Sequence, residues 1–213
     1  MAGDDSDDYA LVAYGGNAED VVLMRAFAGR RGGFFVDVGA GNPVRGSLTK
    51  NLVERLGWRG INIEPLPERY ELLRDARPGD VTLRLAISDR SGTASFFRIV
   101  PGPGKTGGGG LSTLDRDVLA VHVADGWRYE EIQVQTVPLQ TVLSEHAEPG
   151  FDLLKVDVEG AEAAVLASAD LAWWRPRAIV VEATFLLTSR PPCHKDGKPG
   201  DLGAGYPRTL RHP

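Results

Sequence analysis

Short apolar runs rich in β-branched residues recur along the chain, and most are followed by turn residues and a segment with helical periodicity. Runs of this length, bounded by glycine or charged residues, are typical of buried β-strands. Because strands and helices alternate, the pattern predicts an α/β fold with a mostly parallel, doubly wound sheet and helices on both faces. The predicted strands lie at residues 33–38, 60–64, 81–87, 151–158 and 178–182.

Four stretches between or before these runs space their apolar side chains as an amphipathic helix does. In the second stretch, Ser47 is the predicted N-cap and Gly57 the stop signal, and Pro78 ends the third. The predicted helices cover residues 17–28, 47–56, 67–77 and 162–173.

Residues 96–113 break this alternation. Within them, residues 101–113 are rich in glycine and proline, which predicts a mobile loop with no means of burying itself. The loop is either a tolerated surface insertion or a lid that orders over substrate. Its Gly-Lys-Thr triplet is not a phosphate-binding P-loop, because Ile99 occupies the position where that motif requires glycine. The tail at residues 185–213, rich in proline and glycine, is predicted to be irregular.

The 213-residue length fits a single domain, residues 1–213, with a core at residues 14–184 and an acidic N-terminus at residues 1–13 that we expect to be disordered. A formal net charge of −5 and the absence of a long basic run argue against nucleic acid or a membrane as partner. The single cysteine, Cys193, excludes an internal disulfide and a cysteine-based zinc site. With neither a secretory signal nor an apolar span of ~20 residues, we expect a cytoplasmic protein. A homodimer is compatible with these features.

The residues after each strand are the first candidates for binding, since ligands of open α/β sheets lie beyond the carboxyl ends of the strands. After the first strand, Gly39 and Gly41 let a ligand approach the backbone, and Asp37 is suited to holding a cationic group, directly or through water. Glu64 ends the second strand, where a carboxylate accepts two hydrogen bonds from a ribose diol. Residues 86–89 offer an apolar wall and a polar rim to a flat base.

Taken together, these features indicate a ligand that contains adenosine. A dinucleotide-binding site requires the motif G-x-G-x-x-G/A, but Val44 stands at the third glycine position. The turn therefore does not fit the binding of a pyrophosphate. S-adenosyl-L-methionine has no phosphate. It needs a carboxylate or carbonyl near its ammonium group, which Asp37, Gly39 and Asp157 are able to supply.

Longer segments resemble the FkbM-type S-adenosylmethionine-dependent methyltransferases, a class I family. The resemblance extends from about residue 14 to residue 184, and its most specific parts are the Gly-Trp-Arg-Gly segment and the acidic segment after the fourth strand. The matching segments are residues 16–23, 35–43, 47–49, 57–65 and 152–162.

The resemblance implies a Rossmann-like sheet with strand order 3-2-1-4-5-7-6. It also implies methyl transfer, commonly O-methylation of a hydroxyl on a sugar or natural-product scaffold such as a glycoside or polyketide in secondary metabolite biosynthesis, with S-adenosyl-L-homocysteine as product. Only residues 205–206 resemble the start of the family's last two strands, so that C-terminal hairpin is predicted to be missing or degenerate.

The resemblance also implies which residues bind the cofactor. Carried over by position, Asp37, Gly39 and Ser47 line the methionine end, and Glu64, followed by Pro65, binds the ribose. The other implied contacts are Tyr14 and residues 17–20, which close over the cofactor, and Ala86, Ile87 and Ser88, which border the adenine.

Asp157 and Glu159 are the candidates for the base that deprotonates the acceptor hydroxyl. If the fourth strand continues through them, their side chains alternate in direction, and Asp157 is then free to hold the cofactor ammonium while Glu159 faces the acceptor. The alternative is that Glu159 and Glu162 stabilise a helix dipole. Asp157, Glu159 and Glu182 also offer hard oxygen ligands to a divalent metal, but their spacing defines no site, so no metal is predicted.

Two other functions stay open. The first is an NAD(P)-dependent Rossmann oxidoreductase, against which Val44 and the absence of a Tyr-x-x-x-Lys proton donor both argue. The second is a non-catalytic remnant that keeps the cofactor pocket without turnover.

Overall fold

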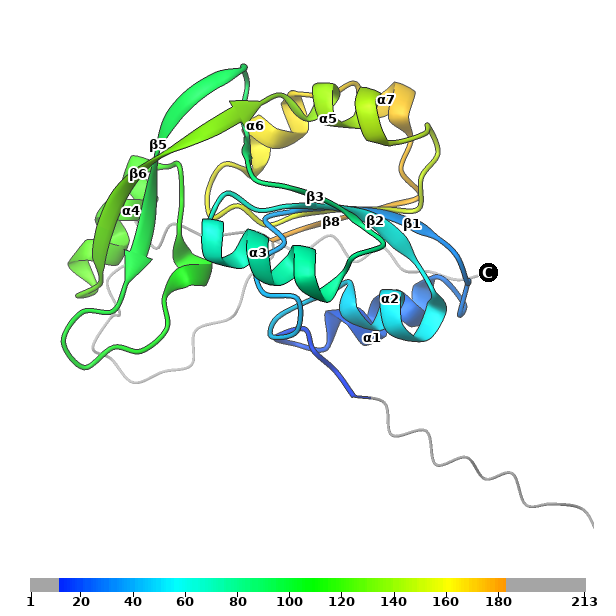
Figure 1. Cartoon of the computed structure of the whole chain (residues 1–213), viewed down its shortest axis with the longest axis horizontal. Helices are drawn as coiled ribbons and strands as arrows, with labels where there is room; N and C mark the ends of the chain where they lie inside the picture. The colour runs from blue at the N-terminus through cyan, green and yellow to red at the C-terminus, as the bar shows by residue number, and fades with distance from the viewer. Residues whose placement is uncertain (1–11, 183–213) are drawn as a thin grey trace, which may run out of the picture.

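The centre of the molecule is a five-stranded parallel sheet with strand order β3-β2-β1-β7-β8. It is seen in a computed structural model that describes residues 12–182 (Figure 1). The α/β prediction is confirmed, and each of the five predicted runs contains one strand of this sheet. The strands are β1 (Phe34–Val38), β2 (Arg59–Ile63), β3 (Val81–Leu83), β7 (Leu153–Val156) and β8 (Ala178–Val181). The predictions for residues 1–11 and for the tail, including the degenerate last hairpin, lie outside the described residues.

Helices cover both faces of this sheet (Figure 1). On one face, apolar side chains of the sheet such as Phe35 and Leu153 pack against Leu23, Leu52 and Trp58. On the other face, a larger cluster surrounds side chains such as Val36 and Leu154. The first face carries α1 (Glu19–Ala26), α2 (Lys50–Leu56) and α3 (Pro67–Ala76), and the second carries α5 (Leu139–His146), α6 (Glu162–Ala167) and α7 (Leu171–Trp174).

A second sheet stands beside the first, with strand order β4-β6-β5 (Figure 1). Its long strands pair antiparallel, and the chain between them holds a 3-10 turn and a helix. The predicted single strand at residues 81–87 is therefore wrong: β3 pairs with β2, whereas the next strand pairs with β6 in the second sheet. The remaining elements are β4 (Ala86–Ile87), β5 (Gly92–Val100), η1 (Gly109–Leu111), α4 (Arg116–Ala124) and β6 (Arg128–Val137).

The glycine-rich segment is anchored at its far end, contrary to the expectation that it had no means of burying itself. Thr113 is fully buried, and its backbone exchanges two hydrogen bonds with Phe97 of β5 at 2.8 and 3.1 Å. Phe96 and Ile99, which we assigned to the irregular region, are buried strand residues. The predicted mobility of the glycine-rich loop at residues 101–113 stays a prediction.

Two details of the helices also differ from the prediction. Helix α2 begins at Lys50 and not near Ser47, whose hydroxyl takes part in other contacts, while Gly57 ends the helix in the left-handed conformation as expected. The helix predicted at residues 162–173 is divided into α6 and α7, because Asp170 caps the backbone N–H of Trp173 and starts a new helix there.

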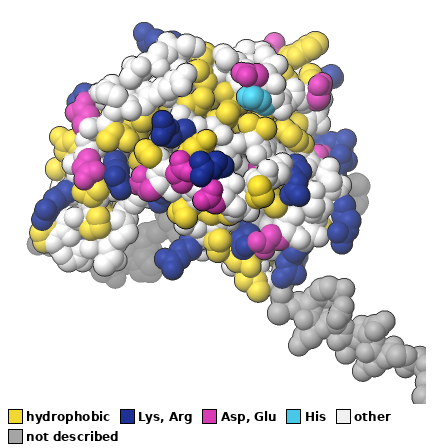
Figure 2. Space-filling model, in the orientation of Figure 1, with side chains coloured by type: hydrophobic (Ala, Val, Ile, Leu, Met, Phe, Trp, Pro, Cys, Tyr) yellow, Lys and Arg dark blue, Asp and Glu magenta, His cyan; other side chains and the backbone are white. Residues whose placement is uncertain are grey.

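The described residues contain no helix with the length and apolarity that crossing a membrane requires. On the face shown in Figure 2, basic and acidic side chains are interspersed, and several pair with each other. One such group lies on α3, where Arg74 pairs with Glu71 and Asp75 at 2.5 and 2.9 Å.

Candidate active site

A cavity of about 380 Å³ opens at the carboxyl ends of the parallel strands. Its polar side is formed by the loops after β1, β2 and β7, and its apolar side by residues of the second sheet and the chain before it. Most of the predicted site residues line it: Gly39, Gly41, Glu64, Pro65, Ala86, Ile87, Asp157 and Glu159.

Glu64 lies directly beside the glycine turn, as predicted. Its carboxylate accepts hydrogen bonds from the backbone N–H of Gly41 and of Leu66, each at 2.9 Å, and the residue is only 4% exposed. Burial raises the pKa of Glu64, although these two bonds favour the charged form. Each carboxylate oxygen keeps a second lone pair, so Glu64 is still able to accept hydrogen bonds from a ligand.

The turn after β1 needs glycine for two reasons. Gly39 and Gly41 have φ angles of +75° and +65°, in the left-handed region that side chains disfavour. A Cβ at position 39 would also lie 1.8 Å from the carbonyl oxygen of Asp157. The loops after β1 and β7 therefore pack backbone to backbone at the floor of the cavity.

Four of the predicted cofactor-binding residues are not among those that line this cavity: Tyr14, Asp37, Ser47 and Ser88. Asp37 and Ser47 are each 1% exposed, with their side chains engaged inside the protein. The Thr49 hydroxyl donates to Asp37 at 3.1 Å, and the Ser47 hydroxyl accepts from Arg77 at 2.7 Å. Direct contacts of these two side chains with a ligand stay untested predictions.

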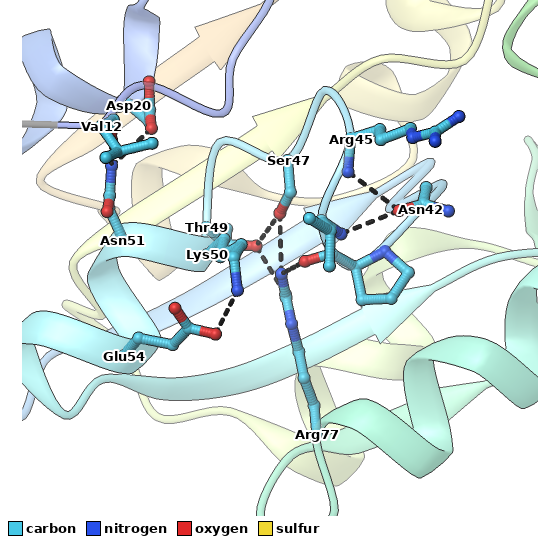
Figure 3. Close-up of polar contacts among 12 residues, drawn as sticks. Val12, Asp20, Asn42, Arg45, Ser47, Thr49, Lys50, Asn51, Glu54 and Arg77 are labelled. Atoms are coloured by element: carbon cyan, nitrogen blue, oxygen red, sulfur yellow. Dashed lines mark hydrogen bonds and ion pairs between the residues drawn. The ribbon is translucent and has the colours of Figure 1, made fainter.

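Arg77, at the end of α3, holds the loop between β1 and α2 in place (Figure 3). Its guanidinium donates to Thr49 Oγ1 at 2.7 Å and to Ser47 Oγ at 2.7 Å, and to the carbonyl of Pro43 at 3.0 Å. It also donates to Asn62 of β2 at 3.0 Å. One buried cation therefore ties this cavity-forming loop to the sheet.

The turn before α1 is fixed by a buried aspartate. Asp20 accepts hydrogen bonds from the backbone N–H groups of Tyr14 and Gly15 at 2.9 and 3.3 Å. It also accepts a hydrogen bond from the Asn51 side chain at 2.6 Å (Figure 3). These bonds hold residues 12–18 against α2. The turn then presents Asn17 and Glu19 to a second cavity.

The second cavity, of about 470 Å³, lies next to the first and shares five of its residues. The new parts of its wall come from the turn before α1 and from the end of β8, including Glu182. The shared residues are Gly46, Gly110, Lys155, Asp157 and Glu159. The tip of β7 therefore faces both cavities at once.

Three carboxylates converge at this tip, and their oxygens lie within 4.8 Å of one another. Burial and the charges of Asp157 and Glu162 raise the pKa of Glu159 to about 7. A hydrogen bond with Asp157, together with burial, raises the pKa of Glu182 to about 8. At neutral pH the cluster of Asp157, Glu159 and Glu182 therefore carries a proton. Hard divalent cations prefer oxygen ligands of this kind, so this cluster is where one would bind.

Glu159 has an unusual backbone, with φ at +55°. Strand β7 ends at Val156, so the alternation of Asp157 and Glu159 along a continued strand was a wrong expectation. A hydrogen bond of 2.6 Å from the Thr113 hydroxyl to the Glu159 carbonyl supports this conformation, and Glu162 accepts from the N–H groups of Val158 and Gly160. Such backbone strain is common at functional sites.

Sequence reasoning missed several residues of the site. Phe96 and Leu114, from the region of the second sheet, form part of the apolar wall. The Arg69 guanidinium lies between Gly41 and Gly109, close to the position that a side chain at either glycine would take. Lys155 lines both cavities, and it carried a signal we overlooked: a lysine inside an otherwise apolar strand is rarely buried without a partner.

Comparison with known proteins agrees with this architecture. A family model described as Methyltransferase FkbM domain matches residues 37–196, a range that starts in β1 and includes the glycine turn and the acidic cluster. Comparisons with curated proteins and with solved structures gave no match. Since the family model covers well over half of the chain, and the sheet has the strand order expected of a Rossmann-like methyltransferase fold, the chain belongs to the FkbM methyltransferase domain family.

Proposed function

We propose that this protein uses S-adenosyl-L-methionine to methylate a hydroxyl group of a small molecule, a sugar or a natural-product scaffold. The observation that carries the proposal is the pair of cavities that meet at the tip of β7, where Asp157 and Glu159 line both. One cavity has the features required for an adenosine-containing cofactor, and the other leaves room for an acceptor beside it.

The residues of the first cavity fit the cofactor. Glu64 is suited to the ribose hydroxyls, and the apolar wall around Ala86 and Ile87 is suited to the adenine. The left-handed turn at Gly39 leaves backbone accessible beside Asp157, which offers its carboxylate to the ammonium group. When bound, the cofactor supplies an activated methyl group on a sulfonium.

The second cavity fits a hydroxyl-rich acceptor. Asn17, Glu19 and Glu182 line it together with the two carboxylates at the tip of β7. Carboxylates accept hydrogen bonds from hydroxyl groups, and several in one cavity orient a polyol. Leu48, Leu111 and Val180 form an apolar part of the same wall, so the lining suits a sugar or a hydroxylated scaffold that has an apolar face.

Glu159 is the proposed general base. A base is most effective when its pKa lies near the working pH, and the pKa of Glu159 is raised to about 7. In its ionised form Glu159 takes the proton of the acceptor hydroxyl, while the proton shared by Asp157 and Glu182 reduces the negative charge beside it.

Isothermal titration calorimetry tests the cofactor directly. S-adenosyl-L-homocysteine should bind with heat release at a stoichiometry of one per chain, whereas NADH should not bind. The opposite pattern would support the oxidoreductase alternative and reject the proposal. A panel of glycosides and hydroxylated polyketides, screened by mass spectrometry for a gain of one methyl group, then identifies the acceptor and distinguishes an enzyme from a non-catalytic remnant.

A further inference from the structure

A row of buried polar side chains crosses the parallel sheet at one level. In the strand register Asn62 of β2 is paired with Asp37 of β1, and Asp37 is paired with Lys155 of β7. The three residues are 0%, 1% and 5% exposed. They lie on the face covered by α1 and α2, among apolar neighbours such as Phe35 and Leu153. Burying charged groups in a sheet costs stability, so this row calls for a specific explanation.

Asp37 is held by side chains inside the protein and does not line either cavity. The Thr49 hydroxyl donates to its Oδ2 atom at 3.1 Å. Arg77 in turn donates to Thr49 Oγ1 at 2.7 Å (Figure 3). The Oδ1 atom of Asp37 lies 3.1 Å from the Lys155 ammonium. The partners of Asp37 are therefore internal, and its ion pair with Lys155 is its link toward the cavities.

Lys155 extends from this row to the cavity floor. Its ammonium donates to the carbonyl oxygen of Gly39 at 2.6 Å and lies 3.2 Å from Asp157 Oδ2. Burial favours the neutral amine, but Asp37 and Asp157 outweigh it and raise the pKa of Lys155, so the charge is kept. One ammonium thus contacts the glycine turn after β1, the carboxylate after β7 and the buried Asp37.

We propose that Lys155 is the positioning residue of the cofactor site, and that Asp37 acts only through it. The ammonium orients the Gly39 turn and the Asp157 carboxylate toward the cofactor, while Asp37, supported by Thr49 and Arg77, sets where the ammonium lies. This assignment replaces the expectation that Asp37 itself holds a cationic group of the ligand. It rests on the proposed use of S-adenosyl-L-methionine.

A comparison of single and double variants separates positioning from simple charge compensation. Lys155→Met leaves Asp37 buried without its cation, and Asp37→Asn leaves Lys155 with one carboxylate fewer, so each single variant should melt at a lower temperature than the wild type. The double variant Asp37→Asn/Lys155→Met removes both members of the ion pair and should regain most of the loss. The control is Arg74→Met, which removes an exposed cation on α3 that has no part in this row.

The affinity for S-adenosyl-L-homocysteine, measured by calorimetry, should follow a different order. We expect about tenfold weaker binding for Lys155→Met and for the double variant, because both lose the donor to Gly39 and Asp157. Asp37→Asn should weaken binding less than Lys155→Met does. A double variant that regains both stability and affinity would show that Lys155 only neutralises Asp37. A larger loss for Asp37→Asn than for Lys155→Met would show that Asp37 contacts the ligand directly.

Lys155→Arg keeps the test decisive if Lys155→Met does not fold. It retains a cation beside Asp37, but a planar guanidinium is unable to reproduce the point contacts of an ammonium. We expect a melting temperature near that of the wild type with about tenfold weaker binding, and wild-type affinity in this variant would overturn the inference. Absence of binding by the wild-type chain would instead reject the proposed cofactor.

Discussion

At the residue scale, three side chains of the site have different contacts, and each set of contacts suggests a different role. Glu64 accepts from the backbone of Gly41 and Leu66 in the first cavity. Glu159 is held in a left-handed conformation where the two cavities meet, and Lys155 links the sheet interior to both cavities. Individual substitutions at these positions therefore test separate steps, namely cofactor binding, proton removal and positioning.

Glu64→Ala should weaken the binding of S-adenosyl-L-homocysteine by about 1–3 kcal/mol, the scale of lost charge-assisted hydrogen bonds. Calorimetry measures the dissociation constant directly. Glu68→Ala is the matched control, since Glu68 belongs to α3 and pairs with Arg98 at the surface. An unchanged dissociation constant for Glu64→Ala would remove the ribose role.

Glu159→Gln should lower kcat by about 10²- to 10⁴-fold, the usual contribution of a general base, while the affinity for S-adenosyl-L-homocysteine changes little. The wild-type rate should rise as the pH increases through about 7, because Glu159 acts only after it loses its proton, and this limb should be absent from the variant. Glu131→Gln, an exposed substitution on β6, serves as control. Retention of the pH limb in Glu159→Gln would assign the base elsewhere.

At the element scale, the second sheet contributes to the site through its connection to the first. The chain after β5 returns to the parallel sheet, and the Thr113 hydroxyl donates to the Glu159 carbonyl while accepting from the N–H of Asp115. This connection joins segments 46 residues apart in the chain. The second sheet and the connection after β5 are therefore part of the site, since Phe96 of β5 and Ser112 of the connection line the first cavity.

Thr113→Val keeps the shape of this side chain but removes its donor. We expect a loss of about 1 kcal/mol in the free energy of unfolding and a lower kcat, because the Glu159 carbonyl loses its hydrogen bond and its backbone is no longer held. Denaturant unfolding and steady-state kinetics measure the two effects. Thr93→Val, at an exposed position of strand β5, should change neither. A wild-type kcat in Thr113→Val would mean that the contact is structural only.

The strands also show which parts of the fold a local sequence pattern is able to predict. All five parallel strands were predicted from short apolar runs, and Glu64 lies beside Gly41 as its place after the second strand indicated. The second sheet was missed, because the end of β5 was assigned together with the glycine- and proline-rich segment that follows it, and because the partner of β4 comes some fifty residues later in the chain. Periodicity describes one segment at a time and contains no information on which distant segment pairs with it.

At the scale of the whole molecule, the acidic cluster couples stability to pH. Glu159 and Glu182 have folded-state pKa values of about 7 and about 8, both above the ordinary value of 4.5. Between the ordinary pKa of 4.5 and these folded-state values, the native state binds more protons than the unfolded state. The contribution of the two groups to stability therefore falls as the pH rises through this range. The cluster therefore destabilises the fold most above pH 8.

Glu182→Gln removes one of these carboxylates. The melting temperature of the variant relative to the wild type should increase from pH 5 to pH 8.5, since only the wild type has to ionise Glu182 beside Asp157. Thermal unfolding at a series of pH values measures this difference. Glu148→Gln, at an exposed position outside the cluster, should show no such trend. A difference independent of pH would mean that Glu182 does not titrate in this range.

The sequence by itself determined the α/β architecture, the positions of the parallel strands and the family, because apolar periodicity and motif spacing are properties of neighbouring residues. It also placed Glu64 and the glycine turn at one edge of the sheet. Only the tertiary structure decided which charges meet. Asp37 and Lys155 are paired across strands 118 residues apart, and Glu182 joins Asp157 and Glu159 from a different strand. Their ionisation and orientation depend on distance and burial, which arise only when those strands lie side by side.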